Sequence, residues 1–317
     1  MSKDFKQQPL AWTGERYVPE IEGTIELEHL HRYLLAEKFV HDKTVLDIAS
    51  GEGYGSNILS AAAKFVIGVD ISEEAVNHAR LKYRKPNLEF RVGSADNIPV
   101  DSNSVDVVVS FETIEHLDKH EEMMTEIKRV LKPGGILIIS SPDKYQYSIV
   151  PGYTNPYHVK ELLKEEFEEL LSKYFKNVCF LGQRVVYGSL IVPEGGSEFL
   201  FQNITPDNDE IGLSRPIYDI AVASDEKLPV MVGGLFEKTV YGQDVAGLIN
   251  YLSSCEQALA EREEQIASLN RAVAERDQQI ANLNQAVAER DEKVAALDMA
   301  LAEREEQIAS LNRAVAE

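Results

Sequence analysis

The stretch VLDIASGEGYG, residues 45–55, joins an aliphatic run to a glycine-rich turn that leads into a helical pattern. Asp47 lies at the end of the aliphatic run. Gly51 and Gly53 allow the chain to turn tightly and to bring its backbone close to a ligand. A strand that passes through such a turn into a helix is typical of nucleotide-binding α/β domains. The stretch therefore predicts the first strand of a sheet, with a ligand site at its carboxyl end.

Four further aliphatic runs, FVIGVD, LEFRVG, VDVVVS and ILIIS, alternate with helical patterns as far as residue 141. Aliphatic strands that alternate with helices indicate βαβ units and a buried parallel sheet. A helix is expected before them at about 25–40, and HVKELLKEEFEELLSKY predicts another after them. NVCFLG and PIYDIAVAS predict two closing strands. The insert between these strands, at about 187–215, either contributes specificity or is only a surface loop.

The last sixty or so residues repeat with a different period, because the triplet AER recurs every two heptads. Aliphatic residues occupy every a position from Leu259 to Val315, whereas the d positions alternate arginine and leucine. Such heptads predict an α-helical coiled coil that either self-associates as a dimer or a trimer or acts as a spacer to a further C-terminal module. The predicted parts are a cap at 1–40, an α/β domain at 41–225, a linker at 226–250 and the coiled coil at 251–317.

Composition excludes several classes of protein. The chain has 317 residues and a formal net charge of −21, which argues against a nucleic-acid partner because such binding depends on cationic side chains. Two distant cysteines, Cys179 and Cys255, fit free thiols in a reducing compartment. The N-terminus has no apolar signal segment, and no run of about 18 apolar residues is present. We expect a cytoplasmic protein that can also bind peripherally to the inner membrane.

Acidic residues follow the next two predicted strands. Asp70 ends VIGVD, where a carboxylate can accept hydrogen bonds from both ribose hydroxyls of an adenosine cofactor. A dinucleotide-binding domain has G-x-G-x-x-G over a pyrophosphate, whereas residues 51–55 have G-x-G-x-G. Asp47 before this turn suits a cationic amino-acid moiety better than a phosphate. Asp96, in GSAD, is placed for an adenine amino group.

Taken together, these residues resemble the class I S-adenosylmethionine-dependent methyltransferases. The resemblance covers 40–145 most strongly. It implies a doubly wound, Rossmann-like sheet of seven strands, mostly parallel with the last strand antiparallel, that binds S-adenosylmethionine. The family's glycine motif matches Asp47, Gly51 and Gly53, with Ala49 where many members have glycine. Its other cofactor contacts fall on Tyr17, Asp70, Ile71, Ala95, Asp96 and Phe111.

The flanking segments WTGERYVPEIEG and EHLHRY resemble a subgroup associated with bacterial surface-polysaccharide biosynthesis of the O-antigen or lipopolysaccharide type. In that subgroup the N-terminal segment caps the cofactor. The resemblance implies that Arg16, Tyr17, His31 and Arg32 approach the methionine carboxylate or the acceptor. A packing helix with solvated polar side chains is an equally good interpretation.

FETIEHL, residues 111–117, follows the VDVVVS strand at the sheet edge where α/β proteins bind ligands. On a helix, Glu112, Glu115 and His116 would share one face. His116 is a candidate general base for a hydroxyl acceptor, because imidazole titrates near neutral pH. Alternatively, these three residues bind Mg²⁺ or Mn²⁺ together with His158 of NPYHVKEL, a set similar to that of small-RNA 3′-end methyltransferases. In a third interpretation, the same side chains only support the local structure.

The leading hypothesis is an O-methyltransferase that acts on a sugar hydroxyl of a glycan or its precursor, with His116, Glu115 and His158 as catalytic residues. One alternative is a methyltransferase for another small molecule or for RNA, although the net charge disfavours RNA. The other is a degenerate scaffold whose coiled coil mediates assembly. The complete set of Asp47, Gly51, Gly53 and Asp70 favours an enzyme over a scaffold.

Overall fold

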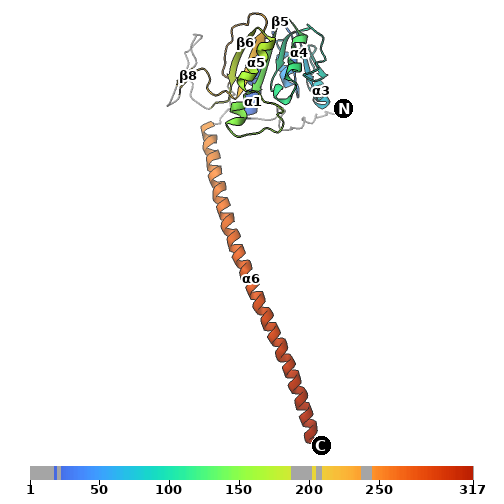
Figure 1. Cartoon of the computed structure of the whole chain (residues 1–317), viewed down its shortest axis with the longest axis vertical. Helices are drawn as coiled ribbons and strands as arrows, with labels where there is room; N and C mark the ends of the chain where they lie inside the picture. The colour runs from blue at the N-terminus through green and yellow to red at the C-terminus, as the bar shows by residue number, and fades with distance from the viewer. Residues whose placement is uncertain (1–17, 20–22, 187–201, 205–208, 237–244, 317) are drawn as a thin grey trace, which may run out of the picture. The chain divides into compact units, whose positions relative to one another are not determined.

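The computed structural model describes residues 18–19, 23–186, 202–204, 209–236 and 245–316 (Figure 1). The chain consists of two compact units, Met1–Lys238 and Thr239–Glu317. The predicted cap residues Arg16 and Tyr17 lie outside the described residues, as does much of the predicted insert. No helix within the described ranges is long and apolar enough to cross a membrane.

A seven-stranded sheet forms the centre of the first unit, in the order β3-β2-β1-β4-β5-β9-β6. Pairing is parallel from β3 to β5, and β9 runs antiparallel between β5 and β6. The strands are β1 (Thr44–Ile48), β2 (Phe65–Asp70), β3 (Leu88–Val92), β4 (Val105–Ser110), β5 (Leu131–Pro142), β6 (Asn177–Gln183) and β9 (Tyr218–Ser224). A separate hairpin pairs β7 (Gln202–Ile204) with β8 (Asp209–Ile211). The mixed sheet confirms the predicted seven-stranded, mostly parallel sheet.

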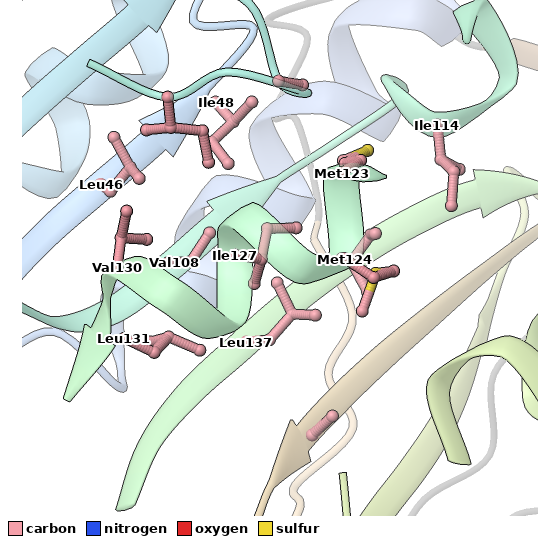
Figure 2. Packing of buried hydrophobic residues seen from close by; sticks show 14 of the residues in the cluster. Leu46, Ile48, Val108, Ile114, Met123, Met124, Ile127, Val130, Leu131 and Leu137 are labelled. Carbon is pink, nitrogen blue, oxygen red and sulfur yellow. The ribbon is translucent and has the colours of Figure 1, made fainter. Parts of the chain in front are cut away.

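Helices cover both faces of the sheet, because successive side chains of a buried strand point in opposite directions. From β1, Leu46 and Ile48 pack in the cluster that includes α4 (His120–Val130) and α5 (Lys164–Tyr174). Figure 2 shows Met123, Met124 and Ile127 of α4 in this cluster. Val45 belongs to the opposite cluster, with α1 (Thr24–Glu37) and α2 (Tyr54–Leu59). Both faces of the central strands are therefore buried, which explains their continuous aliphatic sequence.

Helix boundaries place several site residues. Ser72 caps α3 (Glu73–Lys82) by accepting a hydrogen bond from the Ala75 amide, so the chain turns into a helix directly after β2. α5 begins at Lys164, whereas its pattern predicts a helical start near His158. The amides of Val159 and Lys160 donate instead to the Glu115 carbonyl oxygen, at 2.8 and 3.0 Å. This pairing holds the non-helical segment around His158 against the residues that follow β4.

The second unit is dominated by α6 (Val245–Ala316), a helix of 72 residues. At 1.5 Å per residue its length is about 110 Å. It begins inside the segment predicted as a linker at 226–250. Aliphatic a positions of α6 are exposed in the single chain, for example Leu259 at 62% and Ile266 at 57%. The long helix agrees with the heptad pattern, and the coiled coil and its strand number stay predictions.

Candidate active site

A cavity of about 410 Å³ opens at the carboxyl ends of the central parallel strands. It lies where β1 and β4 are neighbours and the strand order reverses, which is the usual ligand crevice of a doubly wound sheet. Its walls come from the segments after β1, β2, β3 and β4, from α1 and from three more distant side chains. The lining includes Glu28, His29, Tyr33, Ala49, Gly51, Tyr54, Asp70, Ile71, Ala95, Phe111, Glu112, Glu115, His116, Tyr147, His158 and Tyr218.

The turn after β1 contains three residues with left-handed backbone. Their φ values are 57° at Ala49, 55° at Gly51 and 95° at Gly53. Ala49 therefore adopts a conformation that favours glycine, the residue that many relatives of this motif have there. Ala49 and Gly51 line the cavity, whereas Gly53 does not. A Cβ atom at Gly53 would lie 2.8 Å from Cβ of Ala79, so this glycine is required for the packing of α3.

Asp70 has a carboxylate that is fixed at the cavity wall. Its Oδ2 accepts a hydrogen bond from the Gly51 amide and its Oδ1 one from the Ser72 amide, each at 2.8 Å. A carboxylate oxygen can accept further hydrogen bonds, so the two oxygens of Asp70 can still bind two vicinal hydroxyls. Ile71, which is 75% exposed, and Ala95 supply apolar surface beside it. These placements fit the predicted ribose and adenine contacts.

The predicted adenine contact Asp96 is placed less favourably. Its carboxylate accepts a hydrogen bond from Lys119 at 2.8 Å and another from the Ser94 hydroxyl, and the Lys119 bond lowers its pKa. The adjacent Ala95 faces the cavity, but Asp96 is not among the lining residues. The structure thus brings Ala95, and not the Asp96 carboxylate, to the cavity.

Asp47 lies behind the cavity wall and is fully buried. It accepts hydrogen bonds from Ser56 Oγ at 2.6 Å and from the Tyr33 hydroxyl at 3.2 Å. Burial raises the pKa of Asp47 to about 7, although both hydrogen bonds oppose this increase. The ring of Tyr33 separates Asp47 from the cavity and packs edge-on against Tyr54 and Phe111. Asp47 therefore supports the wall rather than lining the cavity.

The predicted helical face of FETIEHL is wrong. Only Ile114–His116 form a short 3-10 helix, η1, and Glu112 has a left-handed φ of 49°. Its Oε1 lies 2.5 Å from Nη1 of Arg32 and accepts a hydrogen bond from Ser140 Oγ at 2.6 Å. Arg32 is only 1% exposed, and a buried guanidinium needs a compensating charge. Glu112 is therefore directed away from Glu115 and His116 and does not belong to a common ligand set with them.

The ion pair between Arg32 and Glu112 also corrects the expectation that His31 and Arg32 of α1 approach the methionine carboxylate or the acceptor. The Arg32 guanidinium lies 4.7 Å from the centre of the Tyr218 ring and is buried outside the cavity. His31 also lies outside the cavity lining and packs against Phe236. The cavity side of α1 presents Glu28 and His29 instead.

Glu115, His116 and His158 do come together. Each offers one ligand atom, and these atoms lie within 4.8 Å of one another. His116 Nδ1 lies 3.0 Å from the Tyr157 carbonyl oxygen. A carbonyl oxygen only accepts, so Nδ1 must carry the hydrogen and Nε2 is the nitrogen that can take up a proton. Glu115 Oε1 lies 4.0 Å from that Nε2.

His158 is held on three sides. Its Nδ1 lies 2.6 Å from Glu161 Oε1, and its Nε2 lies 3.0 Å from the amide nitrogen of Asn155. Its ring stacks on Tyr147 and meets the ring of His116 edge-on. Atoms bound to one Mg²⁺ or Mn²⁺ ion at about 2.1 Å lie roughly 3–4 Å apart. Metal binding would thus require closure of the set and displacement of Asn155.

The lining residues that were not predicted from the sequence include Glu28, His29, Tyr54, Tyr147 and Tyr218. Glu28 accepts a hydrogen bond from the Tyr218 hydroxyl at 3.2 Å, and burial raises its pKa, which the charge of Arg32 opposes. The polar run EHLHRY was the only sequence signal for Glu28 and His29. Tyr218 reaches the site because β9 pairs with β5, and no local pattern indicates that pairing.

Comparisons with known proteins agree with this geometry. Residues 46–139 match the family described as a methyltransferase domain. A probable S-adenosylmethionine-dependent methyltransferase of Mycolicibacterium smegmatis is 37% identical over 170 residues, 51% of this chain and 63% of its own length. A fatty-acid O-methyltransferase of the same organism is 28% identical over 122 residues, 36% of this chain and 44% of its own length.

The matches cover less than two thirds of these relatives. A solved structure, an S-adenosylmethionine-dependent methyltransferase of Thermotoga maritima described as a possible histamine N-methyltransferase, is 21% identical. It covers 63% of this chain and 90% of its own, with a TM-score of 0.46. The family match spans the strands β1 to β5 that build the cavity. The chain therefore carries a class I, Rossmann-like S-adenosylmethionine-dependent methyltransferase domain.

Proposed function

We propose that this chain is an O-methyltransferase that transfers a methyl group from S-adenosylmethionine to a sugar hydroxyl of a bacterial surface polysaccharide or its precursor. The observation that carries the proposal is the orientation of His116 at the cavity. The Tyr157 carbonyl holds its Nδ1–H, so its Nε2 is the proton acceptor. An acceptor hydroxyl needs such a group, because an alcohol is a weak nucleophile at neutral pH.

The residues present fit the cofactor, which supplies an electrophilic methyl group when bound. Asp70 would hold the ribose hydroxyls, since both of its oxygens are already oriented by backbone amides. Ile71 and Ala95 would contact the adenine through their apolar surface. The backbone of Ala49 and Gly51, which lines the cavity, would hold the remaining part of the cofactor.

His116 removes the proton of the acceptor hydroxyl at Nε2. The Tyr157 carbonyl fixes the ring with its hydrogen on Nδ1, so a proton taken up at Nε2 gives an imidazolium cation. The Glu115 carboxylate, 4.0 Å from Nε2, adds electrostatic stabilisation of that cation. General base catalysis of this kind typically contributes about 10²–10⁴-fold to the rate.

The wall opposite the cofactor segments favours a hydroxyl acceptor. Glu28, Glu112 and Glu115 all line the cavity and can accept hydrogen bonds from hydroxyl groups. Arg32 balances the charge of Glu112, so Glu28 and Glu115 are the carboxyl groups that disfavour an acidic acceptor. Tyr147 and Tyr218, with ring centres 6.0 Å apart, offer apolar surface for the C–H face of a sugar. The acidic wall makes a fatty-acid carboxylate, the acceptor named for one relative, a poor substrate here.

The metal hypothesis remains as a second mechanism for the same reaction. Glu115, His116 and His158 would then hold a divalent ion that binds the sugar oxygens. The base mechanism and the metal mechanism can be distinguished by assays of methyl transfer, with and without EDTA, to a panel of glycans and nucleotide sugars. Activity that survives EDTA supports His116 as the base, whereas activity that EDTA abolishes and Mn²⁺ or Mg²⁺ restores supports the metal.

The variant His116→Ala tests the shared requirement. We expect its kcat to fall by about 10²–10⁴-fold while calorimetric binding of S-adenosylmethionine is unchanged. His41→Ala is a matched control, because the His41 side chain is 79% exposed and pairs with Asp42 on the surface. Absence of cofactor binding by the wild-type chain would favour the scaffold interpretation instead.

α6 is proposed to oligomerise the enzyme. Its aliphatic a positions are exposed in the single chain, and a second or third copy of α6 would bury them. Such a coiled coil would connect two or three methyltransferase units in one assembly. The enzyme is proposed to act in the cytoplasm or at the inner membrane, where glycan precursors are available.

A further inference from the structure

We propose that a second hollow, beside the acceptor end of the cavity, binds a phosphate or diphosphate group. The hollow measures about 400 Å³ and is lined by Gln146, Arg184, Val185, Val186, Arg215 and Ile217. None of these residues lines the cofactor cavity. The identity of the acceptor as a phosphorylated sugar rests on the proposed function, whereas anion binding at the two arginines does not.

The hollow adjoins the active site through the backbone. Gln146 and Ile217 line the hollow, and the next residues, Tyr147 and Tyr218, line the cofactor cavity. Consecutive Cα atoms are about 3.8 Å apart, so the backbone at these two places forms a wall between the two sites. The Ile217 amide donates to the Gln183 carbonyl oxygen at 3.0 Å, which holds the ends of β6 and β9 together. The proposal places the sugar of the acceptor in the cavity and its directly attached phosphate across this wall.

The two arginines are available for an anion. Nε of Arg184 is buried and has no hydrogen-bond partner in the part of the chain that the structure describes. Within that part, neither Arg184 nor Arg215 forms an ion pair, although the protein has 53 acidic and only 32 basic residues. Other described arginines, such as Arg91 and Arg129, are paired with carboxylates. Guanidinium groups match phosphate oxygens with two parallel hydrogen bonds, so phosphate is the expected ligand.

Backbone strain at Arg215 also supports a ligand site at the hollow. Its φ is 49°, in the left-handed region that L-residues seldom adopt. Strained residues of this kind cluster at ligand sites, where the surrounding structure maintains them. Val185 and Val186 add exposed apolar surface, which suits an organic phosphate better than a free ion. The expected ligand is the phosphate or diphosphate of a sugar-phosphate acceptor, carried either by a nucleotide or by a lipid.

Calorimetric titration of the full chain with sodium pyrophosphate tests the site. The comparison uses the wild type, the double variant Arg184→Gln/Arg215→Gln and the control Lys64→Gln. Lys64 is exposed just before β2, which β1, β4 and β5 separate from β9 and β6, so its loss changes the net charge without touching the hollow. We expect the double variant to bind pyrophosphate at least about tenfold more weakly and the control to bind as the wild type does.

Equal pyrophosphate affinity in the wild type and the double variant would overturn the proposal. A parallel titration with S-adenosylmethionine reports the first site separately, and we expect the double variant to retain that binding. If the wild type binds pyrophosphate through the arginines but not S-adenosylmethionine, the anion site stands and the proposed function fails. Two further ligands then distinguish the carrier of the phosphate. Arginine-dependent binding of UDP-glucose in solution indicates a nucleotide carrier, and arginine-dependent binding to phosphatidylcholine vesicles with undecaprenyl phosphate indicates a lipid carrier.

Discussion

Replacing Asp47 by asparagine tests whether the carboxyl group behind the cofactor loop is protonated in the folded protein. Burial raises its pKa from 3.8 to about 7, and hydrogen bonds from Ser56 and Tyr33 oppose this only in part. In the unfolded chain the carboxyl titrates near its ordinary value. Between these two pKa values the folded state binds more protons than the unfolded state. The stability of the protein must therefore fall as the pH rises through this window and level off above pH 7.

The magnitude follows from the two pKa values. Each pH unit inside the window changes the free energy of unfolding by about 1.4 kcal/mol, so the whole window corresponds to about 4 kcal/mol. Between pH 5.5 and pH 8 the loss is about 2 kcal/mol. Asparagine has the shape of aspartic acid but does not titrate, so Asp47→Asn lacks this loss. Other titrating groups contribute equally to both proteins and cancel in the difference.

Urea denaturation of the full chain at several pH values, followed by near-ultraviolet circular dichroism, measures this difference. We expect Asp47→Asn to gain about 2 kcal/mol of stability relative to wild type between pH 5.5 and pH 8. Asp106→Asn provides a control whose difference from wild type should not vary between pH 5.5 and pH 8. Although burial raises the pKa of Asp106, hydrogen bonds from the Thr44 amide and Lys132 bring it below its ordinary value, so its carboxyl stays ionised over this range. A difference for Asp47→Asn that does not vary with pH would refute the reasoning.

Three further predictions concern packing and assembly. Glu112→Ala leaves the Arg32 charge buried without its partner and should cost about 3–5 kcal/mol in urea denaturation, whereas Arg32→Met combined with Glu112→Leu should cost much less. Gly53→Ala should lower the free energy of unfolding by about 2–4 kcal/mol, because its φ is left-handed and its Cβ would collide with α3. Ile280→Asp with Leu283→Asp should reduce the oligomer mass in analytical ultracentrifugation; an unchanged mass would contradict the coiled coil.

Much of the fold follows from local sequence. Continuous aliphatic runs between helical patterns predict the parallel strands, because a strand covered on both faces has no polar side. Gly51 and Asp70 are far apart in the sequence, yet both lie at the carboxyl ends of parallel strands. Carboxyl ends of parallel strands meet at one edge, so their proximity was predictable, and the 2.8 Å contact between them agrees with it.

Residues that depend on non-local pairing were not predictable. Tyr218 enters the site from β9, and Arg32 is buried because Glu112 turns toward it. A left-handed φ at Glu112 has no signal in FETIEHL, since glutamate rarely adopts it. The pattern instead predicts a helix, on which Glu112 and His116 would share one face. The observed arrangement separates Glu112 from the set of Glu115, His116 and His158.

This separation changes the balance between the two mechanisms. With Glu112 bound to Arg32, the ligand set has one carboxylate, Glu115, and two imidazoles. Mg²⁺ prefers oxygen ligands, so the loss of one carboxylate weakens the case for it most. His158 would also have to leave Asn155, whereas the Nδ1–H of His116 is already held by a carbonyl, which leaves Nε2 as the nitrogen that takes up a proton. The geometry thus favours proton transfer to His116 over metal binding, and the EDTA assay decides between them.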